Sequence, residues 1–154
     1  MKTRLFRLVH STALPNILAA RFSPNRFHVT PEEAKNTSYT STSLATCRRE
    51  VMHHLGGFAL HNMVEVEFEV DLERVIDLTD PKQRADLDIE PNDLLEDTED
   101  THAIPQSVAK RLRRKGIEGI LVPSARDHDG KNMVLFLENI DPQKIRKVRE
   151  TLIE

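Results

Sequence analysis

The sequence predicts a single α+β domain that spans residues 1–154. A chain of this length has the size of one domain and can bury a substantial core. Segments with strand-like alternation and segments with helical spacing follow one another in irregular order, which argues against regular β-α repeats. We therefore expect about five strands and four helices around one core.

The strands are predicted from alternation and from β-branched content. The clearest is 63–70, where Val64, Val66 and Phe68 alternate with glutamates, so that one face is apolar and the other acidic. The segment 75–78 would continue it briefly. The remaining strands are expected at 4–10, at the Thr-, Ser- and Tyr-rich stretch 36–41, at 117–122 and at 133–137.

Two helices are predicted from apolar spacing and from end signals. Ser43 can cap a helix that runs to about residue 55 and is followed by Gly56 and Gly57. Its apolar stripe consists of Leu44, Cys47, Val51 and Leu55. A second helix is expected over 105–115, with Gly116 as its stop.

Two further helices are expected at less regular places. Asp141 and Pro142 suit the N-cap and first position of a last helix. Its buried stripe would consist of Ile145, Val148 and Leu152. A short helix is also expected near residues 16–20.

An acidic segment interrupts the regular elements between residues 86 and 100. It carries eight Asp or Glu residues and no Lys or Arg. Such a segment is typical of a solvated loop with a short helix, and the alternative is a surface for a basic partner.

Composition and motifs exclude several classes of function. The net charge is −3, so no direct nucleic-acid partner is expected. A single cysteine indicates a reducing compartment, hence a cytoplasmic protein, and no apolar run is long enough for a membrane span. The basic start of the chain is similar to a transit peptide, but residues 5–9 fit a folded strand better. Walker, GxGxxG and HExxH motifs are absent, so we expect no resident cofactor and no metal.

Five residues on separate elements stand out as candidates for a site. They are Arg7, Arg26, Tyr39, Glu50 and Ser124. An aromatic ring and a carboxylate bracket the strand-turn-helix segment 39–50, and such a pair can stack a flat ring and stabilise positive charge on a sugar. Arginine binds a pyrophosphate through two parallel hydrogen bonds. Each residue also has a structural alternative: surface charge, core tyrosine, helix charge or turn cap.

At this point the sequence resembles the RES domain family, named for an arginine, a glutamate and a serine. The resemblance rests on an ordered set of short matches over residues 4–140: Phe6-Arg7, Arg26-Phe27-His28, Tyr39-Thr40-Ser41 with Glu50, and Pro123-Ser124 with Asn132. Two departures concern Arg26. The family's glycines before this arginine are missing here, and His28 replaces the usual asparagine, so Arg21 is a rival for its role.

The resemblance implies a mixed sheet with flanking helices similar to ADP-ribosyltransferases. It also implies a toxin that degrades NAD by hydrolysis or phosphorolysis, with NAD as substrate and an Xre-type helix-turn-helix antitoxin as partner. Glu50, Arg7 and Tyr39 would then be catalytic, and Arg7, Arg26, Tyr39 and Ser124 would bind NAD. The alternatives are a protein ADP-ribosyltransferase that uses the same site, and an NAD-binding or interaction module without activity.

The resemblance leaves the acceptor of the ADP-ribose open between water, phosphate and protein. It also leaves open whether the protein forms a homo-oligomer and which antitoxin it meets. If Arg7 and Arg26 line a cleft, we expect the antitoxin to fill it with an acidic or carboxylate-ended tail.

Overall fold

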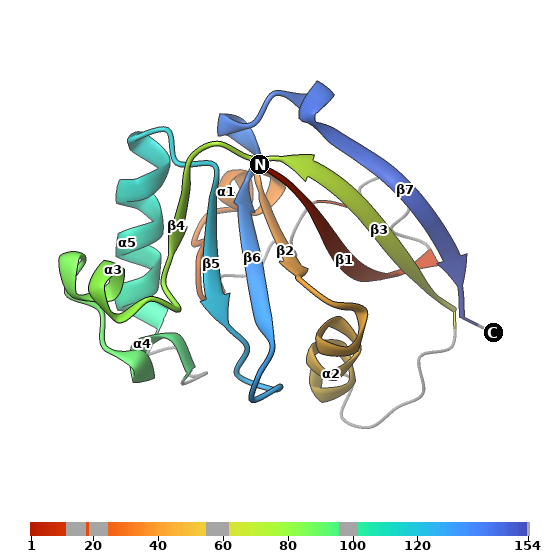
Figure 1. Cartoon of the computed structure of the whole chain (residues 1–154), viewed down its shortest axis with the longest axis horizontal. Helices are drawn as coiled ribbons and strands as arrows, with labels where there is room; N and C mark the ends of the chain where they lie inside the picture. Colours follow the sequence, from red (N-terminus) through yellow and green to blue (C-terminus); the bar gives the residue numbers. More distant parts are fainter. Residues whose placement is uncertain (12–17, 19–24, 55–61, 96–101, 154) are drawn as a thin grey trace.

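A computed structural model describes residues 1–11, 18, 25–54, 62–95 and 102–153 of the chain. Its centre is a seven-stranded mixed sheet in the order β4-β5-β6-β2-β1-β3-β7 (Figure 1). The strands are β1 (Lys2–His10), β2 (Thr37–Ser41), β3 (Met63–Asp71), β4 (Val75–Asp77), β5 (Gly119–Pro123), β6 (Lys131–Phe136) and β7 (Ile145–Leu152). The β4–β5 pair is parallel and the other pairs are antiparallel.

Five α-helices and two short 3-10 helices accompany the sheet in the described residues. They are α1 (Pro31–Lys35), α2 (Leu44–His54), α3 (Pro81–Asp86), α4 (Pro91–Leu95), α5 (Ala103–Arg114), η3 (Leu137–Asn139) and η4 (Pro142–Lys144). This composition confirms the α+β class, although the sheet has more strands than the sequence predicted.

The strand β3 shows the predicted alternation in full. Val64, Val66 and Phe68 are buried, while the glutamates between them lie on the opposite face. Antiparallel pairing sets Leu5 of β1 opposite Phe68 and Val9 opposite Val64, so these side chains share one face. Together with Met133 and Leu135 of β6 and other side chains, they form the hydrophobic core of that face.

The helices α2 and α5 pack on the other face of the sheet. Registered pairs align Phe6, Ser41, Asn132 and Val122 in one row across β1, β2, β6 and β5. The α5 residues Val108, Ala109 and Leu112 join a core cluster with Ile120, Val122, Val134 and Phe136. Cys47 of α2 packs with Leu8, Met63 and the partly buried Phe6. The row therefore lies on the helix-covered face.

The prediction of a last helix was wrong. Asp141 does cap a turn, since its carboxylate accepts a hydrogen bond from the Gln143 backbone, but that turn is the short η4. Residues 145–152 then form β7, which pairs with β3. Arg146 lies opposite Glu69 and Arg149 opposite Glu67. The apolar residues of this segment have helical spacing, but the pairing of its arginines with the glutamates of β3 makes it a strand.

Other expectations fall partly outside the described residues. Of the short helix expected near residues 16–20, only residue 18 belongs to the described part of the chain. Gly56 and Gly57 are also outside the described residues. Gly116 ends α5 as predicted, with a φ of 79°. The acidic segment holds the end of α3 and all of α4, whose Leu94 is buried in the core. Residues 96–100 of that segment are outside the described part.

Candidate active site

The β2–α2 segment forms the centre of the candidate site. Ser43 caps α2 as predicted, because its hydroxyl accepts a hydrogen bond from the Thr46 backbone at 3.1 Å. The buried face of the helix includes Cys47, with Leu44 and Val51 packed beside it. Glu50 is partly buried on α2, near the β5–β6 hairpin.

Glu50 is held by two side chains from that hairpin. Ser124, which follows β5, donates a hydrogen bond to Glu50 Oε1 at 2.5 Å. Asn132 of β6 donates to the same oxygen through Nδ2 at 2.8 Å. Ser41 of β2 in turn donates to Asn132 Oδ1 at 2.8 Å and so fixes the orientation of the amide. Neither bond uses Oε2, so the carboxylate is oriented while Oε2 has no hydrogen-bond partner in the described part of the chain.

The serine is itself fixed by the turn between β5 and β6. Its hydroxyl oxygen accepts hydrogen bonds from the backbone amides of Arg126 and Asp127, at 3.2 and 3.1 Å. Its own amide donates to the Gly130 carbonyl at 2.9 Å. Ser124 is 5% exposed, so both its position and its hydrogen-bonding direction are determined by the protein.

Arg7 lies on β1 between Phe6 and Leu8, so its register assigns it to the sheet face opposite the Glu50 network. Its Nη1 donates to the Leu18 carbonyl, the Ser38 hydroxyl and the Tyr39 carbonyl, at 3.1, 3.2 and 3.3 Å. Burial lowers the pKa of the guanidinium to about 10, so Arg7 still carries its charge at neutral pH. The structure therefore places a partly buried cation at the seam between β1 and β2.

The orientation of the Tyr39 side chain is fixed by two contacts of its hydroxyl. The hydroxyl accepts a hydrogen bond from the Phe27 backbone at 3.1 Å and contacts His28 Nδ1 at 2.8 Å. The ring also packs at 6.4 Å from the Phe27 ring and 5.7 Å from the His28 ring. Burial raises the pKa of Tyr39.

Arg26 lies in the turn that holds Tyr39. The turn is closed by a bridge between Asn25 and His28, and Gln106 of α5 donates to both of their carbonyls. The Arg26 amide donates to the Asn25 side chain at 2.7 Å. Its guanidinium charge acts on Tyr39 and favours the ionised phenol, but burial outweighs this effect on the pKa of Tyr39. Arg21, the rival arginine, is outside the described residues.

The structure thus joins some of the predicted residues and separates others. Glu50 and Ser124 are in direct contact. Arg7 meets Tyr39 through the Tyr39 carbonyl, on the other side of β2 from Glu50. Residues 41, 28 and 132 complete these networks but were not among the predicted site residues. All three had a signal, because they belong to the set of matches quoted above, but the contact of His28 with Tyr39 is set by tertiary packing.

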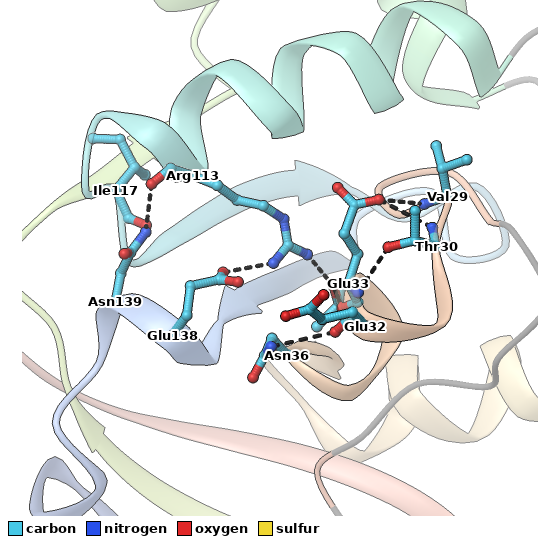
Figure 2. Close-up of polar contacts among 10 residues, drawn as sticks. Val29, Thr30, Glu32, Glu33, Asn36, Arg113, Ile117, Glu138 and Asn139 are labelled. Carbon is cyan, nitrogen blue, oxygen red and sulfur yellow. Dashed lines mark hydrogen bonds and ion pairs between the residues drawn. The ribbon is translucent and has the colours of Figure 1, made fainter.

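A recess of about 230 Å³ lies apart from these residues (Figure 2). It is lined by α1, the end of α5 and η3, with Arg113 at its centre. Arg113 pairs with Glu138 at 2.5 Å, donates to the Thr37 hydroxyl and stacks over the Phe136 ring at 4.4 Å. Its two terminal nitrogens are engaged by Glu138 and Thr37, which joins α5 to the sheet, so we assign this recess a structural role.

Two features are absent from the described residues. No cluster of three or more His, Cys, Asp or Glu side chains in that part of the chain is arranged to hold a metal ion. No helix there is long and apolar enough to cross a membrane.

Comparison with protein families gives a match over nearly the whole chain. The model of the RES domain matches residues 4–152. The chain belongs to the RES domain family. The match includes every residue of the networks around Glu50, Arg7 and Tyr39. No curated protein matches the chain in a direct sequence search.

A solved structure supports the fold of this RES domain. The chain is similar to a protein in the crystal structure of the M. tuberculosis MbcT–MbcA toxin–antitoxin complex, with a TM-score of 0.76 and 19% identity. The similarity covers 99% of this chain and 85% of that one. At this identity the likeness establishes a shared fold.

Proposed function

We propose that this RES domain is the toxin of a toxin–antitoxin pair and that it cleaves the nicotinamide–ribose bond of NAD. The observation that carries the proposal is the Glu50 carboxylate, which Ser124 and Asn132 hold in a fixed orientation. A preorganised carboxylate is the group that this reaction needs. The family match and the fold of the MbcT–MbcA neighbour support the same assignment.

The chemistry follows from the charge that develops on the sugar. When the bond from ribose C1′ to the nicotinamide nitrogen breaks, its electron pair goes to the nitrogen and nicotinamide leaves neutral. The ribose becomes an oxocarbenium ion, and water or phosphate adds to C1′ with loss of a proton. Glu50 would stabilise this cation through Oε2, directly or through a ribose hydroxyl. The carboxylate therefore lowers the energy of the transition state more than that of the bound substrate.

The arginines are proposed to hold the pyrophosphate. Arg7 is charged at neutral pH and lies at the β1–β2 seam, so it would have to reach the pyrophosphate between these two strands, from the face opposite Glu50. Arg26 is the second candidate. Tyr39 would stack on the nicotinamide with its ring, whose orientation is fixed by the contacts of its hydroxyl.

The biological setting is part of the same proposal. An enzyme that consumes NAD in the cytoplasm would arrest the cell that makes it, so it needs an inhibitor. We propose an Xre-type helix-turn-helix antitoxin, in line with a structural neighbour that was solved as a toxin–antitoxin complex. An acidic tail of the antitoxin would fill the cationic part of the site.

The experiment that tests the proposal is a turnover assay with the purified protein. NAD labelled in its adenylate half is incubated in phosphate-free buffer and in phosphate buffer. The proposal expects release of nicotinamide, with the label in ADP-ribose or in a phosphorylated ADP-ribose. Intact NAD in both buffers would contradict it.

The same assay separates the alternative activity. If a cell extract is added and the label becomes attached to its proteins, with little free ADP-ribose formed, the site would be assigned to protein ADP-ribosylation instead. Calorimetric binding of NAD without any turnover would identify a binding module.

A further inference from the structure

The Glu50 network is attached to a second set of contacts between α2 and the β5–β6 turn. Thr46 precedes Glu50 by one helical turn, so both side chains emerge on the same side of α2. The Thr46 hydroxyl donates to Asp127 Oδ2 at 2.8 Å, while Ser124 reaches Glu50 at 2.5 Å. The turn therefore docks on the helix at Thr46 and at Glu50, and Arg49 of α2 adds an exposed ion pair to Asp127 Oδ1 at 3.5 Å.

The Thr46 contact is the end of a chain of hydroxyl groups. Ser43 donates a hydrogen bond to Thr46 Oγ1 at 2.9 Å, and the Thr46 hydroxyl in turn donates one to the Asp127 carboxylate. A hydrogen bond to a charged acceptor is stronger than one between neutral groups, and donors in a chain reinforce one another. Thr46 is 2% exposed, so water competes little for its hydroxyl.

Gly130 shows how closely the turn approaches the helix. A Cβ atom at this position would lie 2.5 Å from Thr46 Oγ1, 2.7 Å from Thr46 Cγ2 and 2.9 Å from Asp127 Oδ2. No side chain fits there without displacing the turn. The Gly130 amide also donates to the Asp127 carbonyl, and its carbonyl accepts from the Ser124 amide, so one short loop carries all three residues.

We propose that Asp127 is a positioning residue, which docks the β5–β6 turn on Thr46 and thereby places Ser124 against Glu50. The expected effect on NAD cleavage rests on the proposed function. The docking of the turn by Asp127 does not depend on that function. Asp127 acts on Glu50 through Ser124, because the Asp127 amide and the Ser124 hydroxyl share a hydrogen bond. A shift of the turn by about 1 Å would lower the rate by ten- to a hundredfold.

The test compares Asp127→Ala with Asp127→Asn and with Asp129→Ala. Asp127→Ala is expected to lower kcat for NAD cleavage at least about tenfold, with a smaller change in KM. Asp127→Asn should retain most activity, because an amide oxygen still accepts the Thr46 hydroxyl. Asp129 is exposed on the same turn, so Asp129→Ala is the matched control and should behave as wild type.

Two further measurements distinguish positioning from a loss of folding. In a Ser124→Ala background, Asp127→Ala should cause little additional loss of kcat, since its effect passes through Ser124. An equal loss in both backgrounds, or unchanged kcat in the single variant, would overturn the inference. A crystal structure of Asp127→Ala is the readout that needs no turnover. We expect the Ser124–Glu50 hydrogen bond to be broken in this variant, and an intact bond would overturn the inference. This readout holds even if the wild-type protein leaves NAD unchanged. Unchanged NAD would contradict the proposed function alone.

Discussion

Ser124 donates a 2.5 Å hydrogen bond to Glu50 across 74 residues of sequence. The serine leaves β5 and the glutamate belongs to α2, so the bond joins the two elements on which the candidate site is built. Removing the hydroxyl with Ser124→Ala also deprives two backbone amides of their acceptor. We expect kcat for NAD cleavage to fall by about tenfold or more, as for other preorganised groups.

The measurement for Ser124→Ala is steady-state nicotinamide release beside thermal unfolding. Ser107→Ala changes the same residue type on the exposed side of α5 and should leave both values unchanged. A Ser124→Ala variant with wild-type kcat would show that the hydroxyl serves the turn alone.

Tyr39→Phe separates the two roles of this tyrosine. The variant keeps the ring but leaves the buried Phe27 amide without its acceptor, so we expect a loss of about 1–3 kcal/mol in the free energy of unfolding. The KM for NAD should change little, whereas Tyr39→Leu should raise it. Urea denaturation and turnover assays give both quantities. A Tyr39→Leu variant with unchanged KM would argue against stacking on nicotinamide.

Cys47 gives a prediction on pH. Burial raises the pKa of its thiol from 9.0 to about 12, so the folded protein keeps a proton that the unfolded chain releases above pH 9. The stability that this thiol contributes is complete below pH 9 and is lost as the pH rises towards 12. Between pH 8 and pH 10 the wild type should lose about 1 kcal/mol more than Cys47→Ala.

Chemical denaturation at the two pH values measures this difference. Arg7 and Tyr39 are present in both proteins, so the part of their pKa shifts that burial causes is common to the two and cancels in the comparison. The thiol should also react with iodoacetamide far more slowly in the native protein than in urea. Equal reaction rates would contradict the buried position of Cys47.

The Arg113–Glu138 pair predicts where a surface carboxylate matters for stability. Glu138→Ala leaves the buried Arg113 charge without its carboxylate, and because Glu138 is partly exposed we expect a loss of about 2 kcal/mol rather than more. Glu73→Ala is the control, because its pair with Lys144 is exposed and should be worth less than about 1 kcal/mol. Equal effects in urea denaturation would show that Arg113 is adequately solvated without Glu138.

The sequence predicted the elements whose local signals agree with their surroundings. The alternation in β3 and the capped α2 were found because burial on one face leaves a period that can be read directly. The segment 145–152 was misassigned because its apolar spacing is helical, whereas its pairing depends on acidic residues that lie 77 to 82 positions earlier. A local pattern carries no information about such a distant partner.

The same distinction applies to the site. Glu50 and Ser124 could be chosen from an ordered resemblance, and the structure brings them into contact. Sequence reasoning could not find the contact of His28 with Tyr39, or the approach of Gly130 to Thr46, since both depend on how separate segments pack. The roles of Arg7 and Arg26 in binding stay predictions.

The central claim is that Glu50 stabilises the ribose cation during cleavage of NAD. The most direct test is nicotinamide release by Glu50→Gln beside the wild type, with equal thermal unfolding as the condition for comparison. Glutamine keeps the size of the side chain and an oxygen for Ser124 and Asn132, but removes the negative charge. The account predicts a fall in kcat of about a hundredfold or more, and a Glu50→Gln variant that cleaves NAD at the wild-type rate would contradict it.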